Sequence, residues 1–201
     1  MIPGVVLAAG DSTRMGRPKA LLPIGQPPQP FVERVARTLL QGGVDDVIVV
    51  VGALAAQIAN ALQAGAVPVR VVENRGYARG QLSSLVTALE AVDRPGVRAV
   101  VVLPVDMPLV SPDTVRTVLQ AYRSNPHPIV RPCHEGRHGH PVVFDRSLFG
   151  DLRAADPALG ARVVIASHEE FALEVEVGDP GAYRDIDTPE EFERYVGPRT
   201  G

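Results

Sequence analysis

The chain has 201 residues, 45% of them hydrophobic and 21% charged, a length and composition that predict one compact domain with a substantial core. A formal net charge of −3 provides no broad attraction to nucleic acid or to an anionic membrane, so neither is an expected partner. The single cysteine excludes an internal disulfide, and we see neither a signal peptide nor an apolar run of about 20 residues, so we expect a cytoplasmic protein.

Apolar runs rich in Val and Ile alternate with segments of helical spacing in the first part of the chain. Buried parallel strands are predicted at residues 2–8, 47–51, 69–72 and 99–105. Helices are predicted at residues 31–41, 53–64, 82–92 and 111–123. The last of these opens with Ser111 as N-cap and Pro112 at the first helical position. This alternation predicts an α/β fold of the Rossmann-like, doubly wound kind, a mostly parallel sheet flanked by helices.

The pattern of elements changes after about Asn125. Strands are expected at residues 129–132, 141–144 and 171–177, and helices at residues 159–167 and 189–196. We therefore predict a single domain over residues 1–201 in two parts, 1–125 and 126–201. In such a fold, ligands are expected at the carboxyl ends of the strands.

A loop punctuated by glycines follows the first predicted strand. Gly10 and Gly16 can adopt the positive φ angles that a tight wrap around an anion requires, and Arg14 and Lys19 add positive charge. The spacing matches neither G-x-G-x-x-G nor a kinase-type P-loop, because Lys19 lies three residues beyond Gly16. The loop is typical of one that binds the phosphates of a nucleotide triphosphate. The alternative is a solvated loop with two surface cations.

A carboxylate closes the fourth predicted strand. Asp106 follows the apolar run 99–105 and lies between Pro104 and Pro108, which restrict the local backbone. A carboxylate at the end of a buried strand is costly unless it is paired or bound to a cation, and beside a triphosphate Mg²⁺ is the natural cation. The alternative is an aspartate that caps the helix beginning near Ser111.

A second group of carboxylates occurs near the end of the chain, at residues 185–191. In an extended segment, Asp185 and Asp187 would lie on the same face, and one of them would complete the metal site. The alternative is an ordinary helix start, in which the acidic residues complement the positive end of the helix dipole. Both roles can be held by neighbouring residues.

Two further loops carry polar residues at the edge where ligands are expected. The segment 73–85 holds two glycines and two serines, which leave space and hydrogen-bonding groups for a base and a ribose; a helix-capping loop is the alternative. The segment 133–144 holds Cys133, His134, His138 and His140. A zinc centre is disfavoured there because all its ligands would come from one short stretch without helical pairing, so we expect solvated histidines and a buried, structural thiol at Cys133.

Five of these segments together resemble the molybdenum cofactor cytidylyltransferase family. Residues 7–19 match the family pattern L-A-A-G-x-S-x-R-M-G-x-x-K, and residues 106–110, 139–144 and 185–190 match D-M-P-L-V, G-H-P-V-x-F and D-I-D-T-P-E. Residues 74–85 match in part, because Arg75 and Gln81 replace a proline and a methionine of the pattern, which puts base specificity in doubt. Ala9 stands where the guanylyltransferase branch more often has glycine, so the resemblance implies a preference for cytidine.

The resemblance also implies roles for individual residues, and it implies a nucleotidyltransferase fold related to the GT-A type. Residues 1–125 would be the nucleotide-binding part and residues 126–201 the acceptor-side part. The residues implied to be catalytic are Arg14, Lys19 and Asp106. Metal binding would fall to Asp106 and Asp187, with Asp185 in reserve. The implied nucleotide-binding residues are Leu7, Ala8, Ala9, Gly10, Arg14, Lys19, Asn74, Gly80 and Ser84. The acceptor would meet Gly139, His140, Pro141 and Arg162, although Arg162 equally suits an exposed helix face.

By this resemblance, the chain moves CMP from CTP to the phosphate of molybdopterin-bound molybdenum and releases pyrophosphate, with Mg²⁺ as cofactor. A molybdenum hydroxylase would be the client of the product. Two alternatives stay open: a nucleotidyltransferase that uses GTP or another phosphorylated acceptor, and a carrier that binds the finished cofactor without catalysis.

Overall fold

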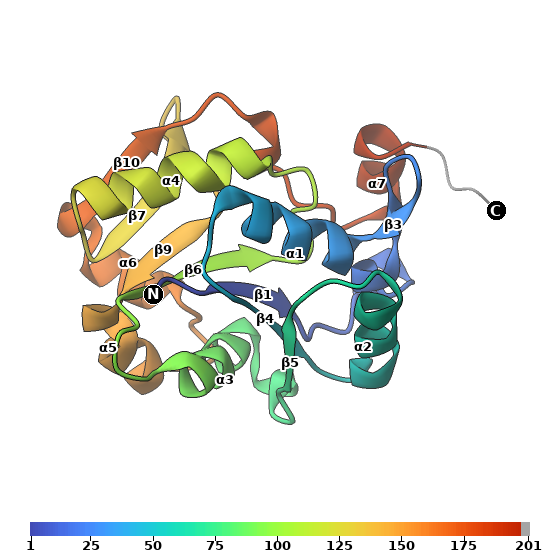
Figure 1. The fold of residues 1–201 in the computed structure, drawn as a ribbon, viewed down its shortest axis with the longest axis horizontal. Coiled ribbons are helices and arrows are strands. Elements are labelled where there is room, and N and C mark those ends of the chain that lie inside the picture. Colours follow the sequence, from blue (N-terminus) through green and yellow to red (C-terminus); the bar gives the residue numbers. More distant parts are fainter. Residues whose placement is uncertain (198–201) are drawn as a thin grey trace.

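The computed structural model describes residues 1–197, which build one twisted sheet between two layers of helices (Figure 1). Along the sheet the strand order is β10-β7-β9-β6-β1-β4-β5, and the short β8 pairs with β7 at the end of that strand. The strands are β1 (Gly4–Ala8), β4 (Val47–Val51), β5 (Arg70–Glu73), β6 (Ala99–Pro104), β7 (Ile129–His134), β8 (Arg137–His138), β9 (Val142–Asp145) and β10 (Ala172–Glu176). A separate small hairpin joins β2 (Pro23–Ile24) to β3 (Gln29–Pro30).

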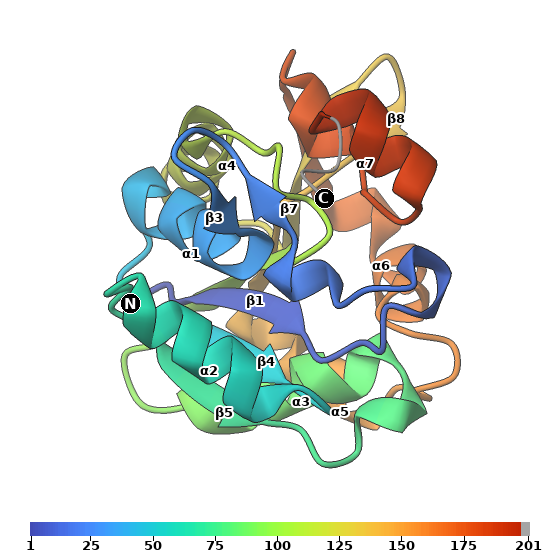
Figure 2. The same ribbon diagram turned by 90° about the vertical axis from the view of Figure 1, so that its right-hand side faces the viewer.

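Helices cover both faces of the sheet. The first layer holds α1 (Phe31–Gly42), α2 (Ala55–Ala64) and α4 (Pro112–Ser124), and the second holds α3 (Gln81–Val92), α5 (Phe149–Ala154) and α6 (Arg162–Ser167). The last helix, α7 (Pro189–Tyr195), lies on the same side of the sheet as α1 and α4 (Figure 2). Its Phe192 packs against Phe31 at the start of α1 and belongs to one apolar cluster with Met15 of the first loop.

Alternation along each strand explains the two layers. In β1, Val6 and Ala8 join the core under α1, while Val5 and Leu7 join the core under α3, as the two-residue period of a strand requires. Each fully buried side chain of this size contributes about 1.5–3 kcal/mol of transfer free energy. A strand that is apolar on both faces is therefore held in the middle of the sheet.

The predicted strands of the first part are all present, and their mutual pairings are parallel. One expectation was wrong: β5 is not buried, because it is the last strand of the sheet, and Val71 is 39% exposed. The second part breaks the parallel pattern, since β9 lies antiparallel between β6 and β7. One continuous sheet thus includes strands from both sides of residue 125.

Two helices begin at N-capping residues. The Ser111 hydroxyl accepts a hydrogen bond from the Thr114 N–H, with Pro112 at the first helical position of α4. At α7, Thr188 and Glu191 form a reciprocal capping box. Within residues 1–197 the structure contains no helix that combines the length and apolar character needed to cross a membrane.

Candidate active site

The first loop wraps tightly after β1, but not through the residues expected. Gly16 has a φ of +66°, as predicted, whereas the second left-handed position is Ser12, with a φ of +54°. Gly10 does not have a positive φ, so the prediction for that residue was wrong. The Ser12 hydroxyl accepts a hydrogen bond of 2.9 Å from the Lys19 N–H, which closes the loop and sets the position from which the Lys19 side chain starts.

Two cations of the loop meet two carboxylates from distant parts of the chain. The Lys19 ammonium lies 3.4 Å from Asp106 Oδ2 and also forms an ion pair with Asp187 Oδ1. Arg14 lies 2.5 Å from the other oxygen of Asp187. The side chains of Lys19 and Asp187 are each 12% exposed, whereas that of Arg14 is 69% exposed. Lys19 is therefore the enclosed cation of these ion pairs, and Arg14 lies on their solvent-exposed side.

Asp106 has a raised pKa. Burial raises the pKa of the Asp106 carboxyl, and the Lys19 ammonium opposes this effect only in part; the negative charge of Asp187 adds to it. The backbone carbonyl of Asp106 accepts a 2.7 Å hydrogen bond from the Ile186 N–H, which joins the C-terminal segment to the end of β6. Because one ammonium contacts both carboxylates, a single cation can lie within reach of Asp106 and Asp187 together.

Asp185 and Asp187 do not occupy equivalent positions. Residues 184–187 form no strand; Asp187 is 9% exposed and faces Lys19, whereas Asp185 is exposed and lines a neighbouring cavity. The Asp187 N–H donates to Glu191 Oε2, at 2.7 Å, so the same short segment both starts α7 and presents a carboxylate to the site. The segment therefore begins a helix, as the alternative predicts, and also presents a carboxylate to Lys19; metal binding by Asp187 stays a prediction.

A cavity of about 250 Å³ opens beside these charges, at the carboxyl ends of β1 and β6. Ala8 is buried behind it and does not line it. The residues expected for nucleotide binding that do line this cavity are Leu7, Ala9, Gly10, Arg14, Lys19, Gly80 and Ser84. Its polar lining and the nearby ammonium suit an anionic, hydrogen-bonding ligand.

Asn74 is positioned differently from these residues. It is 4% exposed and its amide donates to the hydroxyls of Ser83 and Ser84, at 2.9 and 3.0 Å, while its carbonyl accepts from the Gly76 N–H. The side chain thus ties the loop before α3 to the first turn of that helix. Its place in nucleotide binding stays a prediction, and in this structure its contacts are internal.

A second cavity, of about 460 Å³, adjoins the first and shares Leu7, Gly80 and Gln81 with it. Its wall is mainly apolar, and Arg162 and His140 lie among its lining residues. Burial lowers the pKa of His140 to about 4, so at neutral pH this imidazole is uncharged. His140 is half-buried and lines this cavity, so it is not the freely solvated histidine expected there.

Gly139 and Pro141 complete the segment predicted for the acceptor. Gly139 lines a third cavity together with His140, Asp106 and Asp185, and Pro141 is buried without lining any of the three cavities. A Cβ on Gly139 would lie 2.3 Å from the carbonyl oxygen of Ala182, so this position needs glycine for close approach of two backbones.

Sequence reasoning missed several residues of the site. Tyr77 and Thr13 line the first cavity, and Gln81 lines all three. Gly52 lies behind the first loop, where a Cβ would come within 2.5 Å of the Ala9 carbonyl oxygen. A signal for Gly52 was present, because it directly follows the predicted strand 47–51. For Gln81 the sequence offers only a departure from the family pattern.

These features define a class of protein. A parallel sheet presents cations, carboxylates and a polar cavity at the carboxyl ends of its strands, and an adjoining apolar cavity leaves room for a second ligand. The arrangement is that of a nucleotide-dependent transferase. Comparison with known proteins agrees: residues 4–171 match the model of the MobA-like NTP transferase domain, and the chain belongs to this family of nucleotidyltransferases.

Curated relatives cover nearly the whole chain. The chain is 33% identical over 208 residues to "Nicotine blue oxidoreductase" of Paenarthrobacter nicotinovorans, covering 97% of this chain and 96% of the relative. It is 30% identical over 183 residues to "Probable molybdenum cofactor guanylyltransferase" of Mycolicibacterium paratuberculosis, covering 86% and 89%. The names of these two relatives describe different chemistry.

A solved structure has the same fold over its full length. The protein Rv0371c of Mycobacterium tuberculosis H37Rv is 29% identical, with a TM-score of 0.82 over 99% of this chain and 100% of that one. A second structure of Rv0371c, in complex with manganese, has a TM-score of 0.78 over 97% of each chain.

Proposed function

We propose that the chain transfers CMP from CTP to the phosphate of molybdopterin-bound molybdenum and releases pyrophosphate. The observation that carries this proposal is a charge cluster in which Arg14 and Lys19 meet the carboxylates Asp106 and Asp187. Arg14, Lys19 and Asp106 line one polar cavity, and a larger apolar cavity adjoins it. Cations on one side suit a triphosphate, and paired carboxylates suit a divalent cation bound to it. A molybdenum hydroxylase as client and a cytoplasmic location belong to the same proposal.

The donor set fits a magnesium ion. Asp106 and Asp187 already share one cation, the Lys19 ammonium, and they offer the oxygen ligands that Mg²⁺ prefers. They would hold the ion, which when bound supplies charge neutralisation for the triphosphate. The manganese complex of Rv0371c supports a divalent ion in a protein of this fold.

The residues of the chain account for the rest of the reaction by binding and orientation. An oxygen of the acceptor phosphate attacks the α-phosphorus of CTP, the new P–O bond forms, and the bond to the β-phosphate oxygen breaks, so pyrophosphate leaves with its electron pair. A phosphate monoester is largely ionised at neutral pH, so no side chain has to remove a proton. Lys19 and Arg14 would exchange their carboxylate contacts for the triphosphate, where their charge stabilises the transition state.

The adjoining cavity supports an acceptor with a large apolar surface. Its walls come from α3, β6, β9 and the segment before α6, and Arg162 places a cation among them for a phosphate. His140 lies at both this cavity and the third one, and as a neutral imidazole it can donate or accept a hydrogen bond without adding charge. We place the pterin in this cavity.

One observation favours a second candidate, transfer of GMP from GTP. Several curated relatives carry the name of a molybdenum cofactor guanylyltransferase, one of them 30% identical over 183 residues. Ala9, which lines the nucleotide cavity, is the residue on which the preference for cytidine rests. The two candidates share the mechanism and differ only in the base.

The test is pyrophosphate release with Mg²⁺ and molybdenum-loaded molybdopterin, run in parallel with CTP, GTP, ATP and UTP. Release with CTP alone is the expected result, and release with GTP alone would replace CMP by GMP in the proposal. Nucleotide binding without release would favour a non-catalytic carrier. No release with any of the four nucleotides would overturn transfer to this acceptor, and the oxidoreductase activity printed in the name of one relative would be assayed next.

A further inference from the structure

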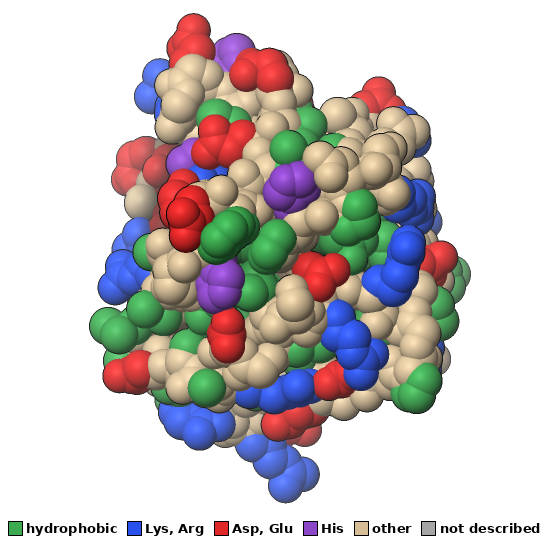
Figure 3. Space-filling model, turned by 90° about the vertical axis from the view of Figure 1, so that its left-hand side faces the viewer, with side chains coloured by type: hydrophobic (Ala, Val, Ile, Leu, Met, Phe, Trp, Pro, Cys, Tyr) green, Lys and Arg blue, Asp and Glu red, His purple; other side chains and the backbone are tan. Residues whose placement is uncertain are grey.

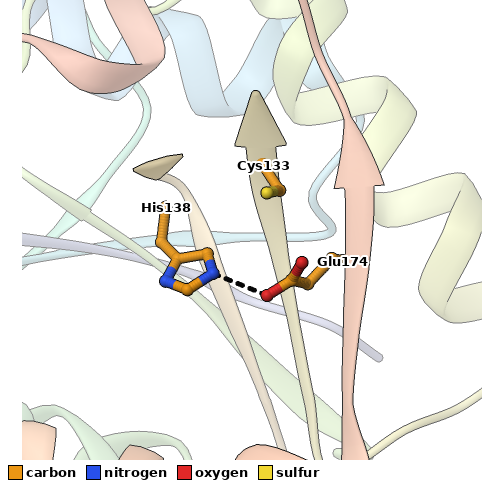
Figure 4. A group of neighbouring side chains, drawn as sticks. All are labelled: Cys133, His138 and Glu174. Carbon is orange, nitrogen blue, oxygen red and sulfur yellow. Dashed lines mark hydrogen bonds and ion pairs between the residues drawn. The ribbon is translucent and has the colours of Figure 1, made fainter. Parts of the chain in front are cut away.

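A second group of potential metal ligands lies where β7, β8 and β10 meet. It is separate from the charge cluster formed by Arg14, Lys19, Asp106 and Asp187. The sulfur of Cys133, a ring nitrogen of His138 and a carboxylate oxygen of Glu174 all lie within 4.8 Å of one another (Figure 4). Cys133 and His138 are direct partners in the register of β7 and β8. Glu174 is on β10, which pairs with the opposite edge of β7. Three adjacent strands thus fix the three Cα positions.

The spacing of these atoms suits a tetrahedral ion. Ligand atoms around zinc are about 3.5 Å apart, given bonds of roughly 2.0–2.3 Å. His138 Nε2 and Glu174 Oε1 are now 2.5 Å apart in a direct contact, so small side-chain rotations would open a place for an ion between them and the sulfur. The side chains of His138 and Glu174 are 39% and 43% exposed, which leaves a path for entry and room for water as a fourth ligand.

The charges around the group also favour a cation. Arg131 pairs with two carboxylates, Glu169 and Glu174, so one guanidinium is set against two negative charges. The two carboxylates therefore exceed the guanidinium by one negative charge. A divalent ion bound to the thiolate would bring that sum to zero. Figure 3 shows histidine side chains lying among acidic ones on the side of the molecule that carries α5, α6 and β10.

Arg131 occupies part of this space, and its second partner lets it move aside. One guanidinium nitrogen lies 3.0 Å from both His138 Nε2 and Glu174 Oε1. The same nitrogen is also paired with Glu169, which stays available as a partner when Glu174 turns to an ion. The exchange replaces a guanidinium by a divalent ion at Glu174 and leaves no buried charge without a partner.

The thiol itself is not set up as a nucleophile. Burial, followed by its hydrogen bond to Glu174, raises the pKa of the Cys133 thiol, so it is protonated at neutral pH. A soft metal ion can still displace the proton, because thiolate, imidazole and carboxylate together are ligands typical of zinc and unsuited to magnesium.

We propose that Cys133, His138 and Glu174 bind one divalent ion of the zinc class, with water as the fourth ligand. The ion would hold β8 against β7 and β10. Because β8 leads directly into Gly139 and His140, and because His138 also lines the third cavity, the ion would fix the segment predicted to meet the acceptor. Its role would be structural, and it would be distinct from the ion proposed to bind Asp106 and Asp187.

Cobalt titration of the tag-free, metal-free full chain tests this site. We expect one Co²⁺ per chain and a near-ultraviolet charge-transfer band from a cobalt–thiolate bond. Cys133 is the only cysteine of the chain, so any such band reports on this residue alone. Cys133→Ser should abolish the band, and His138→Ala and Glu174→Gln should each weaken binding by about 10-fold or more. Zinc should compete with cobalt and raise the Tm of the wild type.

A matched control lies on the same strands. His134 and Glu176 form a similar pair, also 2.5 Å apart, that includes no cysteine, so His134→Ala should leave the cobalt affinity unchanged. The proposal fails if millimolar Co²⁺ produces no thiolate band, or if Glu174→Gln and His138→Ala bind cobalt as tightly as the wild type. Glu174→Gln changes an exposed side chain, so it keeps the test valid even where Cys133→Ser unfolds the chain. No nucleotide is used, so the outcome is independent of the proposed transferase activity.

Discussion

Lys19 is the residue on which the proposed chemistry depends most directly. It is enclosed by two carboxylates, and no other lysine side chain is available to replace it, because Lys19 is the only lysine in the sequence. The Lys19 ammonium is the enclosed positive charge beside the carboxylates that would hold the metal, so a bound triphosphate would meet it there. A substitution of Lys19 therefore tests the contribution of this charge to turnover, and a substitution elsewhere in the loop controls for changes in loop shape.

We expect Lys19→Ala to lower turnover by about 10²-fold or more, because a preorganised charge acts on the transition state. The measurement is steady-state pyrophosphate release with the preferred nucleotide. Arg17→Ala is the matched control: this exposed cation belongs to the same loop but lines a different cavity, so it should stay near the wild-type rate. Equal rates for the two variants would remove Lys19 from the catalytic group.

Asp106 should reduce stability in the ligand-free protein. Burial raises its folded-state pKa above the value in the unfolded chain. The unfolded state therefore loses its proton first as the pH rises, and native stability falls through the window between the two pKa values. Above that window the cost of the buried charge is fully present.

We therefore expect Asp106→Asn to be more stable than the wild type at neutral pH, by up to about 1 kcal/mol, or a Tm increase of about 2–4 °C for a chain of this size. Lys19 keeps Asp187 as a partner in this variant. The advantage should disappear as the pH falls below the unfolded pKa. Thermal melts of the two proteins across pH check this, and a less stable variant at neutral pH would contradict it.

At the scale of elements, the loop before α3 depends on one buried amide. The Asn74 amide donates to the hydroxyls of Ser83 and Ser84, and its carbonyl accepts from the Gly76 N–H, so its loss removes three buried or half-buried hydrogen bonds. The Ser83 hydroxyl keeps its bonds to the carbonyls of Gly76 and Gly80. We expect Asn74→Ala to destabilise the protein by about 1–3 kcal/mol. The nucleotide KM should rise more than kcat falls, because Ser84 and Gly80 line the nucleotide cavity.

Denaturant unfolding and steady-state kinetics measure the two effects. Asn60→Ala, at an exposed position of α2, is the control and should change neither stability nor KM appreciably. An Asn74→Ala protein as stable as this control would mean that the hydrogen bonds of Asn74 contribute no net stability. In that case the loop would be held by its own turn and by the bonds from the Ser83 hydroxyl to the carbonyls of Gly76 and Gly80.

The sequence predicted most elements because their signals are local. The strand 47–51 and the end of the helix at Val92 agree with the structure, and Ser111 caps α4 as its neighbours indicate. What failed depends on pairing across the sheet. A strand such as β5 carries the same Val-rich pattern whether it lies in the middle of a sheet or at its edge, and only the edge position exposes Val71.

The same limit applies to the sites. Arg14, Lys19, Asp106 and Asp187 could each be named from a local motif, and the structure brings them into contact. The group around Cys133 could not be assembled, because Glu174 arrives on β10 and no pattern near residues 133–140 points to it. Asn74 is the opposite case. A motif predicts that it binds the nucleotide, but its contacts in the structure are with its own loop and the start of α3.

At the scale of the whole molecule, the charge cluster joins three segments that are distant in the sequence. The first loop supplies Arg14 and Lys19, the end of β6 supplies Asp106, and the segment before α7 supplies Asp187. Met15 and Phe192 belong to one apolar cluster behind these charges, so the loop and α7 are packed together. A ligand that binds the cluster therefore stabilises contacts between segments from both ends of the described chain.

We expect CTP with Mg²⁺, at about 100 times its Kd, to stabilise the native state by about 2.7 kcal/mol. For a chain of this size that corresponds to a Tm increase of about 5–10 °C. Asp187→Asn should lose most of this shift, because it removes one proposed metal ligand and the partner that positions both Arg14 and Lys19. The exposed Asp113→Asn change on α4, whose partner is the surface residue Arg116, should keep the full shift. Differential scanning calorimetry of the three proteins with and without ligand measures these shifts. An undiminished shift in Asp187→Asn would mean that the nucleotide is held by the first loop without the C-terminal segment.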